Sequence, residues 1–460
     1  MRSAHTVAQV RAAEADLMAQ LPDGTLIQRA AAGLASAVAQ RLGRVYGAEV
    51  VLLVGGGDNG ADALWAGAML ARRGARLEAL LVADPRADAL AAFRAAGGRV
   101  VDLLPPQGLV VDGLVGIGGK GPLRQAELAG QVRDREVVAV DLPSGVDADT
   151  GEIAGEAVRA DLTVTFGTVK PGLLLARGHV GRLHLVDIGL ALPAATVQAL
   201  EDADAAALLP RPHAQDDKYT RGVLGVVAGS QQYTGAAVLS VGAAVAAGAG
   251  MVRFAGAPHA AEQVRARWPE VVVSHHRGSE VVNAGRVQAW VVGPGLGTDV
   301  TAAAAVEAVL AQDVPVLVDA DALTIAAQHQ DWLRDRTAPT LLTPHDREFA
   351  RFGDEVGADR IGSARALAQE LDVHVLLKGD ATVVVGPDGP ARVNTTGSPA
   401  LATAGSGDVL SGGTAALLAQ GLDPLDAGSL GAYLHGLAGR AATGRGASAV
   451  LQAWPARLQA

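Results

Sequence analysis

Residues 49–82, EVVLLVGGGDNGADALWAGAMLARRGARLEALLV, contain an apolar run, a glycine-rich turn, a helical stretch and a second apolar run. A strand, a helix and a second strand in this order form a βαβ unit, in which the two strands are parallel. The alternation continues through DALAAFRAAG (88–97), LVVDGLVG (109–116) and EVVAVDLPSG (136–145). We therefore predict an α/β domain with a parallel sheet and helices on both faces.

The 460-residue chain has room for roughly two or three domains. Around residues 192–215 the pattern breaks into acidic and proline-bearing sequence, and EDADAAALLPRPHAQDDK (201–218) carries no clear strand. A second α/β series begins at GVLGVVAG (222–229) and runs toward the end of the chain. We place the domain boundary near Ala205, which gives domains 1–205 and 206–460.

The composition is that of a globular protein, because hydrophobic residues make up 49% of the chain and charged residues 19%. The net charge of -10 leaves no broad basic surface, which disfavours a general nucleic-acid binder. The chain has no cysteine, which excludes disulfides, thiolate metal sites and cysteine nucleophiles. The first residues lack the apolar core of a signal peptide, and the apolar runs are too short to span a membrane. We expect a cytoplasmic protein with no membrane partner.

The glycine-rich turn GGGDNGAD (55–62) connects a predicted strand to a predicted helix. Backbone N–H groups in such a turn converge at the positive end of the helix, where they can bind phosphate. Two further strand ends carry polar residues, Asp112 before the segment 116–122 and Asp141 before Ser144. Because the carboxyl ends of parallel strands face one crevice, we predict a ligand site there. A purely structural role, as turn formers or helix caps, is the alternative.

The order of these motifs, a glycine loop, VVDGLVGIG (110–118), VDLPSGVD (140–147) and TVTFGTVKPG (163–172), resembles the NAD(P)H-hydrate epimerase family. The resemblance implies a Rossmann-like domain that interconverts the R and S epimers of NADHX and NADPHX, the hydrates of NADH and NADPH, at C6. It implies Asp141 as the acid/base carboxylate and a K⁺ ion held by hard oxygen ligands of Asn59, Asp112 and Ser144. The substrate contacts that it implies are Asp58, Asn59, Gly60, Ala61, Asp62, Gly116, Ile117, Gly118, Gly119, Lys120, Gly121 and Pro122.

The glycine loop departs from the Asn-Asn-Gly-Gly-Asp-Gly that is usual in that family, because Asp58, Ala61 and Ala63 replace an Asn and two Gly. A carboxylate beside a phosphate is unfavourable, and alanine restricts positive φ. We therefore expect an altered substrate affinity or phosphate preference. A ligand-binding or assembly role for the N-terminal half is an alternative.

A second glycine-rich helix start lies in NTTGSPALATAGSGDVLSGG (394–413). The amides of residues 405–408 can form an anion hole for a transferring phosphoryl group, and Asp408 can take a proton from the attacking hydroxyl. Upstream, KGDAT (378–382) follows a predicted strand and can place a cation and amides against nucleotide phosphates. A helix cap at Asp408 and a surface turn at 378–382 are the alternatives.

GSGDVLSGG (405–413) and KGDATVV (378–384) resemble the ribokinase-like fold. TGAAVLS (234–240), VVGPGLG (291–297), VDADAL (318–323) and TPHDRE (343–348) narrow the resemblance to NAD(P)H-hydrate dehydratases, from about residue 208 onward. It implies phosphorylation of the C6 hydroxyl of the S epimer and elimination of phosphate, with Mg²⁺ and with ADP as donor, because fused members usually use ADP. The roles that it implies are base for Asp408, nucleotide contact for Lys378, Gly379, Asp380, Ala381, Thr382, Gly405, Ser406 and Gly407, and hydrate contact for Ala237, Gly295, Gly297 and His345.

Together the two resemblances imply a bifunctional NAD(P)H-hydrate repair enzyme whose partners are the small molecules NADHX, NADPHX and ADP. We expect it to form a homo-oligomer. A ribokinase-like small-molecule kinase with an N-terminal ligand-binding domain is the alternative function. The pair His275-His276 has no third ligand at a suitable spacing, and we interpret it as surface sequence rather than as a metal site.

Overall fold

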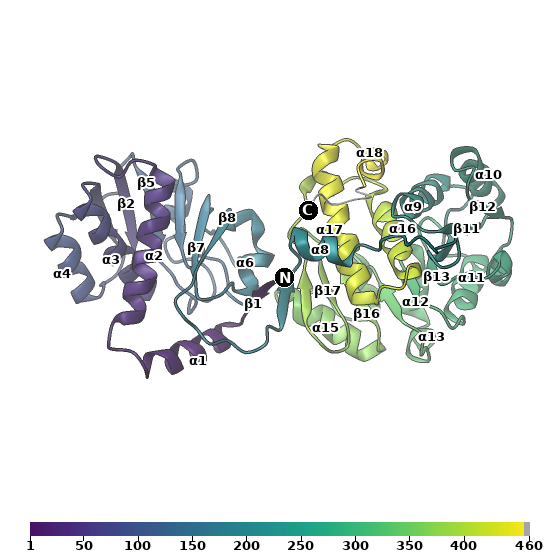
Figure 1. The fold of residues 1–460 in the computed structure, drawn as a ribbon, viewed down its shortest axis with the longest axis horizontal. Coiled ribbons are helices and arrows are strands. Elements are labelled where there is room, and N and C mark those ends of the chain that lie inside the picture. Colours follow the sequence, from purple (N-terminus) through teal and green to yellow (C-terminus); the bar gives the residue numbers. More distant parts are fainter. Residues whose placement is uncertain (455–460) are drawn as a thin grey trace. The chain divides into compact units, whose positions relative to one another are not determined.

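A computed structural model describes residues 1–454, which form two compact units (Figure 1). One unit comprises Ser3–Val197, and the other comprises Met1–Arg2 together with the chain from Gln198 onward. The boundary predicted near Ala205 falls inside helix α8 (Asp202–Leu208), which belongs to the second unit. Residues 201–218, predicted to carry no clear strand, contain α8 and no strand, and β9 (Val197–Ala199) lies just before them.

The first unit is built on a seven-stranded sheet with the order β4-β3-β2-β5-β6-β7-β8. Every neighbouring pair in it is parallel, which confirms the prediction from the βαβ pattern. Its strands are β2 (Glu49–Val54), β3 (Arg76–Leu81), β4 (Arg99–Val101), β5 (Leu109–Gly113), β6 (Val137–Val140), β7 (Leu162–Phe166) and β8 (Arg182–Val186). Its helices are α1 (Val7–Met18), α2 (Thr25–Leu42), α3 (Asp58–Arg72), α4 (Ala87–Ala95), α5 (Ala126–Gln131), α6 (Pro171–Leu175) and α7 (Arg177–Val180).

Both faces of this sheet are covered, because successive side chains of a strand point to opposite faces. Leu52 of β2 packs in a cluster with residues of α2, α3 and α4, whereas Leu53 packs in a second cluster with residues of α5. This explains why the strands are almost continuously apolar rather than alternating. All functional loops must therefore emerge at the ends of the strands.

The second unit contains an eleven-stranded sheet with the order β1-β9-β18-β17-β16-β15-β14-β13-β10-β11-β12. Strands β10 to β16 pair in parallel, and β17 and β18 continue the sheet in antiparallel pairs. Beside β9, the strands are β1 (Arg2–Ala4), β10 (Val223–Val227), β11 (Met251–Ala255), β12 (Val272–Ser274), β13 (Ala289–Val292), β14 (Val316–Val318), β15 (Thr340–Leu342), β16 (His374–Leu377), β17 (Val383–Val385) and β18 (Ala391–Val393).

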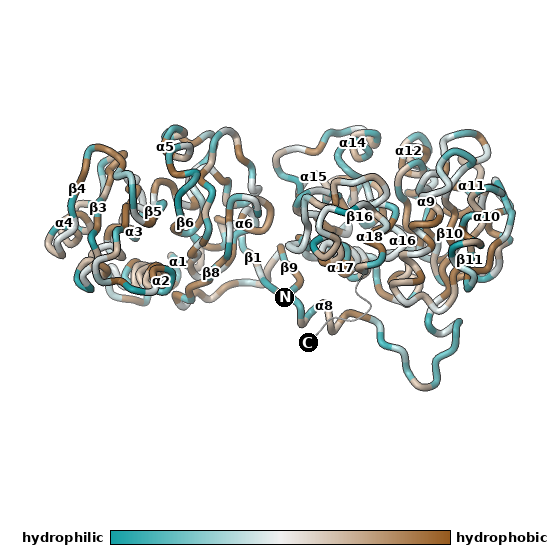
Figure 2. The backbone as a smooth tube through the Cα atoms, turned by 90° about the horizontal axis from the view of Figure 1, so that it is seen from above, coloured by the Kyte–Doolittle hydropathy of each residue, from teal (hydrophilic) through white to brown (hydrophobic). Residues whose placement is uncertain are grey.

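Long helices pack on the parallel part of this sheet. Beside α8, the α-helices are α9 (Thr234–Ala246), α10 (Pro258–Arg267), α11 (Val300–Leu310), α12 (Asp321–Gln328), α13 (Asp331–Arg334), α14 (Asp346–Phe349), α15 (Arg360–Leu371), α16 (Ser406–Ala419), α17 (Pro424–Ala442) and α18 (Ala447–Gln452). Strand β10 is fully buried and apolar beneath α9 and α16 (Figure 2). Within residues 1–454, no helix is both long and apolar enough to cross a bilayer.

Two glycines permit close approaches in this core. A Cβ at Gly412 of α16 would lie 2.0 Å from the carbonyl oxygen of Ser240 in α9, so only glycine lets the two helices pack this closely. A Cβ at Gly225 of β10 would lie 2.1 Å from the ring of Trp290, its register partner in β13. The first contact holds α16, the helix that carries Asp408, close against α9, and the second lets β10 and β13 pair beside the Trp290 ring.

Candidate active sites

A cavity of about 290 Å³ lies at the carboxyl ends of the strands in the first unit. Asp141 follows β6 directly, and its φ of +65° lies in the left-handed region that non-glycine residues seldom adopt. This backbone conformation is part of the tight turn by which the chain leaves the strand. The polar side chains that line the cavity include Glu14, Asp58, Asn59, Asp62, Arg86, Asp141 and Lys170.

Lys170 and Asp141 form a buried ion pair in this cavity. Lys170 Nζ lies 2.5 Å from Asp141 Oδ1, and it also donates to Thr165 Oγ1 and to the carbonyl oxygen of Phe166, each at 3.1 Å. Thr165 Oγ1 and the Phe166 amide donate to the same Oδ1, at 2.9 and 3.2 Å. Three donors thus converge on one oxygen of Asp141, whose side chain lines the cavity.

Asp62 is the second buried carboxyl group of the cavity. Its Oδ1 is buried and has no hydrogen-bond partner among residues 1–454. Burial, followed by the negative charges of Asp141, Asp58 and Glu14, raises the pKa of Asp62 well above its ordinary value. Burial at this position therefore favours the protonated form of Asp62, which can donate a proton.

The other residues predicted to contact the substrate differ in whether their side chains reach the cavity. Asp58 is 89% exposed at its side chain, with Arg86 3.9 Å away, so water and a cation moderate the extra carboxylate of this loop. Gly60 and Ala61 are buried in the first turn of α3 and do not line the cavity. Of the segment 116–122, only Ile117 is among the described lining residues.

The three residues predicted to hold K⁺ meet around Val115. Asp112 is fully buried, and its carboxylate accepts from the Ser144 amide at 2.8 Å and from Ser144 Oγ at 2.7 Å. Val115 N donates to Ser144 Oγ at 3.0 Å, and Asn59 Nδ2 donates to the carbonyl oxygen of Val115 at 3.2 Å. Burial raises the pKa of Asp112, and within residues 1–454 no cationic side chain pairs with it. A monovalent cation held by these hard oxygen atoms would offset the cost of the buried charge, so the residues fit such an ion.

In the second unit the predicted base lies at the start of α16. Gly405 caps the helix with a φ of +86°, and Asp408 lies in the first turn, where the helix presents unpaired amides. Burial, and then the charge of Asp319, raises the pKa of Asp408 to about 7, although Lys378 opposes this shift. A carboxyl group with this pKa is well matched to proton transfer near neutral pH.

Lys378 is the centre of a charged cluster at the ends of β14, β15 and β16. Its Nζ lies 2.8 Å from Asp319 Oδ1 and 3.4 Å from Glu348 Oε2. Burial alone would lower the pKa of Lys378, but Asp319 and Glu348 raise it, so the amine stays charged. Ser411 of α16 donates to the other oxygen of Asp319 at 2.6 Å, which connects the cluster to the helix that carries Asp408.

The backbone between Asp319 and Asp321 is strained. Ala320 has a φ of +52°, which is unfavourable for a residue with a Cβ. Asp321 Oδ2 accepts from the amide of Gly297 at 2.8 Å, and this contact anchors the glycine loop 293–297. The conformation of Ala320 thus lets the carboxylates of Asp319 and Asp321 contact different partners at the same edge of the sheet.

The predicted hydrate contacts differ in their surroundings. His345 caps α14 through Nδ1, which accepts from the amides of Arg347 and Glu348 at 3.1 and 3.2 Å. The proton of the neutral ring therefore lies on Nε2, and the half-exposed side chain can donate from there. Gly295 (φ +60°) packs beside Tyr233, whereas Ala237 is fully buried, so the side chain of Ala237 does not reach solvent.

The predicted nucleotide segment forms the turn between β16 and β17. Gly379 and Asp380 lie in this turn, Ala381 is buried, and Thr382 Oγ1 donates to the carbonyl oxygen of Gly379 at 3.4 Å. A Cβ at Gly407 would lie 3.9 Å from Lys378 Nζ. The Lys378 amine therefore lies close to the first turn of α16.

Two family models match the chain. Residues 224–453 match the NAD(P)H-hydrate dehydratase model, and residues 23–172 match the model described as YjeF-related protein N-terminus. A bifunctional NAD(P)H-hydrate repair enzyme of Mycobacterium leprae is 53% identical over 406 residues, which cover 86% of this chain and 84% of the relative. The chain belongs to this family. A repair enzyme of Corynebacterium glutamicum is 36% identical over 490 residues, covering 86% of this chain and 83% of the relative.

Among solved structures, a ribokinase-like superfamily protein of Enterococcus faecalis matches with a TM-score of 0.51 and 27% identity. The match covers 58% of this chain and 96% of that protein. It confirms the ribokinase-like fold predicted for the C-terminal half of this repair-family chain. The bifunctional assignment predicted from the sequence motifs is confirmed by the family.

Several residues of both sites were not predicted. Lys170, Asp319 and Glu348 lie inside the motifs TVTFGTVKPG, VDADAL and TPHDRE. These motifs are the sequence signal from which the three residues could have been predicted. His275 is exposed, and His276 is partly exposed and lines a cavity, so both lie at the surface.

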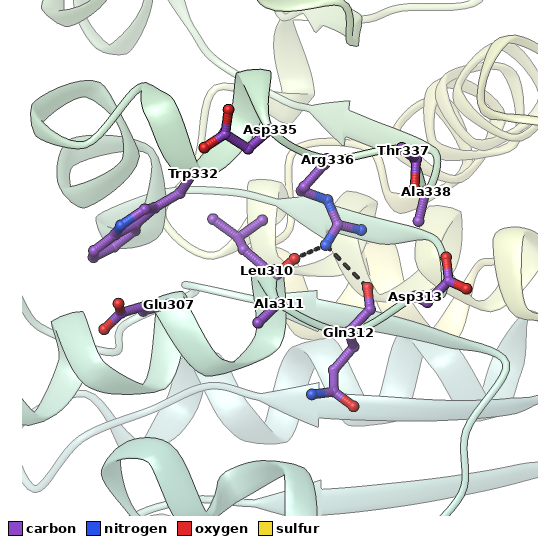
Figure 3. Close-up of a pocket in the computed structure, with 10 residues that line it drawn as sticks. All are labelled: Glu307, Leu310, Ala311, Gln312, Asp313, Trp332, Asp335, Arg336, Thr337 and Ala338. Atoms are coloured by element: carbon purple, nitrogen blue, oxygen red, sulfur yellow. Dashed lines mark hydrogen bonds between the residues drawn. The ribbon is translucent and has the colours of Figure 1, made fainter.

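A further cavity surrounds Arg336, which lies before the start of β15 (Figure 3). Its guanidinium donates to the carbonyl oxygens of Leu310, Gln312 and Val314. These contacts satisfy backbone groups at the end of α11 and before β14. The cavity lies at the amino ends of the strands, away from Asp408. We therefore interpret the role of Arg336 as structural, because it connects the end of α11 to the segment before β14.

Proposed function

We propose that this chain repairs hydrated NADH and NADPH in two steps, epimerisation in the N-terminal unit and nucleotide-dependent dehydration in the C-terminal unit. The observation that carries the proposal is the pair of acid/base sites at the carboxyl ends of two parallel sheets. Each site combines a carboxyl group with a lysine: Asp141 and Lys170 are both buried, and Asp408 and Lys378 are both partly buried. Membership of the repair family supports the same pairing of activities.

For the epimerase, the raised pKa of Asp62 and the ion-paired state of Asp141 favour opposite roles. We assign Asp62 as the proton donor to the departing C6 hydroxyl, while the lone pair of the ring nitrogen forms an iminium bond. Water then adds to either face of C6, and Asp141 Oδ2 accepts its proton. Lys170 holds the Asp141 carboxyl group in position through its contact with Oδ1. K⁺, when held by Asn59, Asp112 and Ser144, supplies positive charge beside the buried Asp112 carboxylate.

For the dehydratase, Asp408 takes the proton of the C6 hydroxyl, whose oxygen attacks the terminal phosphorus of the nucleotide. The amides of residues 405–408 stabilise the transferring phosphoryl group, and Lys378 faces the same space. The C6–O bond then breaks with electrons from the ring nitrogen, which releases phosphate and leaves an iminium ion. Transfer of a C5 proton to the released phosphate then forms the C5–C6 double bond and regenerates the dihydronicotinamide. The carboxylates of Asp319 and Glu348 are hard oxygen ligands that fit Mg²⁺, which supplies charge neutralisation for the phosphates when bound.

We assign ADP as the phosphoryl donor. The test uses the full chain with S-NADHX, Mg²⁺ and either ADP or ATP, and it follows NADH absorbance together with the nucleotide products. Formation of AMP, phosphate and NADH from ADP, with ATP a poorer donor, is the expected result. Formation of ADP from ATP, with ADP inert, would contradict the donor and leave the dehydratase assignment intact. Nucleotide consumption without NADH, on any small alcohol, would favour the alternative kinase function.

A further inference from the structure

The turn that carries Lys170 is held by the N-terminal segment of the chain. This turn, residues 167–170, connects β7 to α6, and Lys170 is its last residue. His5 N donates to the carbonyl oxygen of Val169 at 2.9 Å, and Ala4 and Val169 form a parallel bridge. His5 is 3% exposed and is not among the described residues that line the cavity. It therefore lies in the interior, next to the turn but outside the cavity.

The two ring nitrogens of His5 have different partners. Nε2 lies 3.0 Å from the carbonyl oxygen of Pro193, and Nδ1 lies 2.7 Å from Thr168 Oγ1. A carbonyl oxygen can only accept a hydrogen bond, so Nε2 carries the proton of the neutral ring. Nδ1 is then the acceptor, and the Thr168 hydroxyl donates to it. One side chain therefore connects the segment after β8, where Pro193 lies, to the turn 167–170.

Thr168 lies two residues before Lys170, and its backbone is also held from the side of the cavity. Thr165 Oγ1 lies 3.3 Å from the carbonyl oxygen of Thr168 and 2.9 Å from Asp141 Oδ1. Lys170 Nζ donates to the same Thr165 hydroxyl and to Asp141 Oδ1. A shift of Thr168 would therefore displace the donors that hold the Asp141 carboxyl group.

Packing alone does not require a histidine at position 5. A buried polar ring is unfavourable unless its nitrogens are hydrogen-bonded, and an apolar side chain of similar size would avoid this cost. Both nitrogens of His5 have partners, and the partner of Nδ1 lies in the turn that carries Lys170. These hydrogen bonds fix where Thr168 lies, whereas apolar packing would let the turn shift.

We propose that His5 is a positioning residue of the epimerase. Through Thr168 it fixes the turn, and so it holds Lys170 against Asp141. His5 itself does not touch the substrate. The proposal rests on the epimerase function proposed above, and it deepens that function by assigning a residue outside the cavity.

The first test uses variants of His5 that each keep a different ring contact. His5→Asn places a side-chain oxygen where Nδ1 accepts from Thr168, His5→Gln places an amide N–H where Nε2 donates to Pro193, and His5→Ala removes both contacts. The isomers of NADHX are followed by chromatography without nucleotide, so that only interconversion of R and S is measured.

The kcat for interconversion should fall about tenfold in His5→Ala and in His5→Gln, which is the loss of one hydrogen bond. It should stay within about threefold of the wild type in His5→Asn, because the contact with Thr168 is kept. The KM should stay within about twofold in all three variants. The matched control is His179→Ala, which should change neither constant, because His179 is partly buried in the same unit but is not among the described lining residues. Equal kcat values in the Asn and Gln variants, or a change in KM alone, would overturn the proposal.

A second test asks whether the effects of the partners depend on one another. Thr168→Val keeps the shape of the side chain and removes the hydroxyl, so the double variant with His5→Ala should be no slower than either single variant. In a Lys170→Met background, His5→Ala should likewise lower kcat no further. Additive losses in either pair would overturn the proposal, because they would indicate a general loss of structure.

The third test needs no activity. The chain contains four lysines, Lys120, Lys170, Lys218 and Lys378, so NMR of the full chain with ¹³C-labelled lysine side chains gives few signals. Lys170→Met identifies the Lys170 signal, which should move in His5→Ala and stay in place in His5→Asn. An unmoved signal in His5→Ala would overturn the proposal. Absence of interconversion by the wild type would instead overturn the epimerase function, and the NMR comparison would still decide whether His5 positions Lys170.

Discussion

Lys378 Nζ lies 2.8 Å from Asp319 Oδ1, although 59 residues separate the two in the chain. Lys378 follows β16 and Asp319 follows β14, with β15 between the two strands in the sheet. Because Ser411 of α16 donates to the same carboxylate, this pair connects two strand ends to the helix that carries Asp408. The electrostatic environment of the proposed base is therefore set by residues remote in sequence.

The first prediction concerns Asp408 itself. Replacement by Asn keeps the shape of the side chain but removes the proton acceptor, so the kcat for dehydration should fall by about 10²–10⁴-fold. Nucleotide binding, measured by calorimetry, should stay close to that of the wild type, because the amides of the helix start remain. An activity within about tenfold of the wild type would remove Asp408 from the role of base.

The second prediction concerns the pH dependence of dehydration. Because the pKa of Asp408 is raised to about 7, the ionised base is lost as the pH falls below 7, and kcat/KM should decline about tenfold per pH unit there. The charge of Asp319 contributes to the raised pKa, so Asp319→Asn should move this acid limb to lower pH. A pH profile of kcat/KM measures both, and an unmoved limb in Asp319→Asn would contradict the coupling.

A third prediction separates the two activities. Asp141→Asn should lower conversion of R-NADHX at least about 100-fold, the usual effect of losing an acid/base group, while dehydration of S-NADHX continues at the wild-type rate. Asp62→Asn should have the same selective effect if Asp62 donates the proton. The assay supplies pure R or S hydrate and follows NADH. Equal loss of both activities would indicate a folding defect rather than a lost catalytic group.

The proposed K⁺ ion leads to a fourth prediction. Replacing K⁺ by choline at constant ionic strength should lower the epimerase rate at least about tenfold, because the Asp112 carboxylate is buried without a cationic side chain. Asp112→Asn removes this charge, and its residual rate should no longer respond to K⁺. An Asp112→Asn variant that kept the full K⁺ response would place the ion elsewhere.

The fifth prediction concerns stability. Gly412→Ala should lower the free energy of unfolding of the C-terminal unit by about 1–3 kcal/mol, because its Cβ would lie 2.0 Å from the Ser240 carbonyl oxygen. The matched control is Gly235→Ala in α9, where an added Cβ meets nothing within 4 Å. That variant should be neutral or more stable by about 0.5–1 kcal/mol. Thermal and urea unfolding would measure both, and equal stability of the two variants would contradict the packing argument.

Motif order was enough to predict the two α/β folds and the placement of Asp141 and Asp408. Both carboxyl groups follow local signals, a strand end and a glycine-capped helix start, and these signals do not depend on long-range contacts. The short strands β1 and β9 were beyond prediction, because a strand of three residues carries no periodic pattern.

The contacts within each site could not be predicted in the same way. Lys170 reaches Asp141 across 29 residues, and such pairings depend on which strands become neighbours. The sequence also did not show which residues of the glycine loop would be buried. Ala61 is buried and Asp58, three positions earlier, is exposed, although both were predicted to contact the substrate. Motif membership located the loops, and only the fold determined which side chains enter the cavities.

Because Ala320 has a positive φ, stability and activity place opposite requirements on this position. A non-glycine residue in such a conformation costs about 1–3 kcal/mol, so Gly at position 320 would relax the backbone and stabilise the folded state. The same change would also let Asp319 and Asp321 move away from Lys378 and Gly297, which they now contact. Selection for thermal tolerance alone would therefore favour a more stable but less active protein, and alanine at this position marks a trade-off between the two.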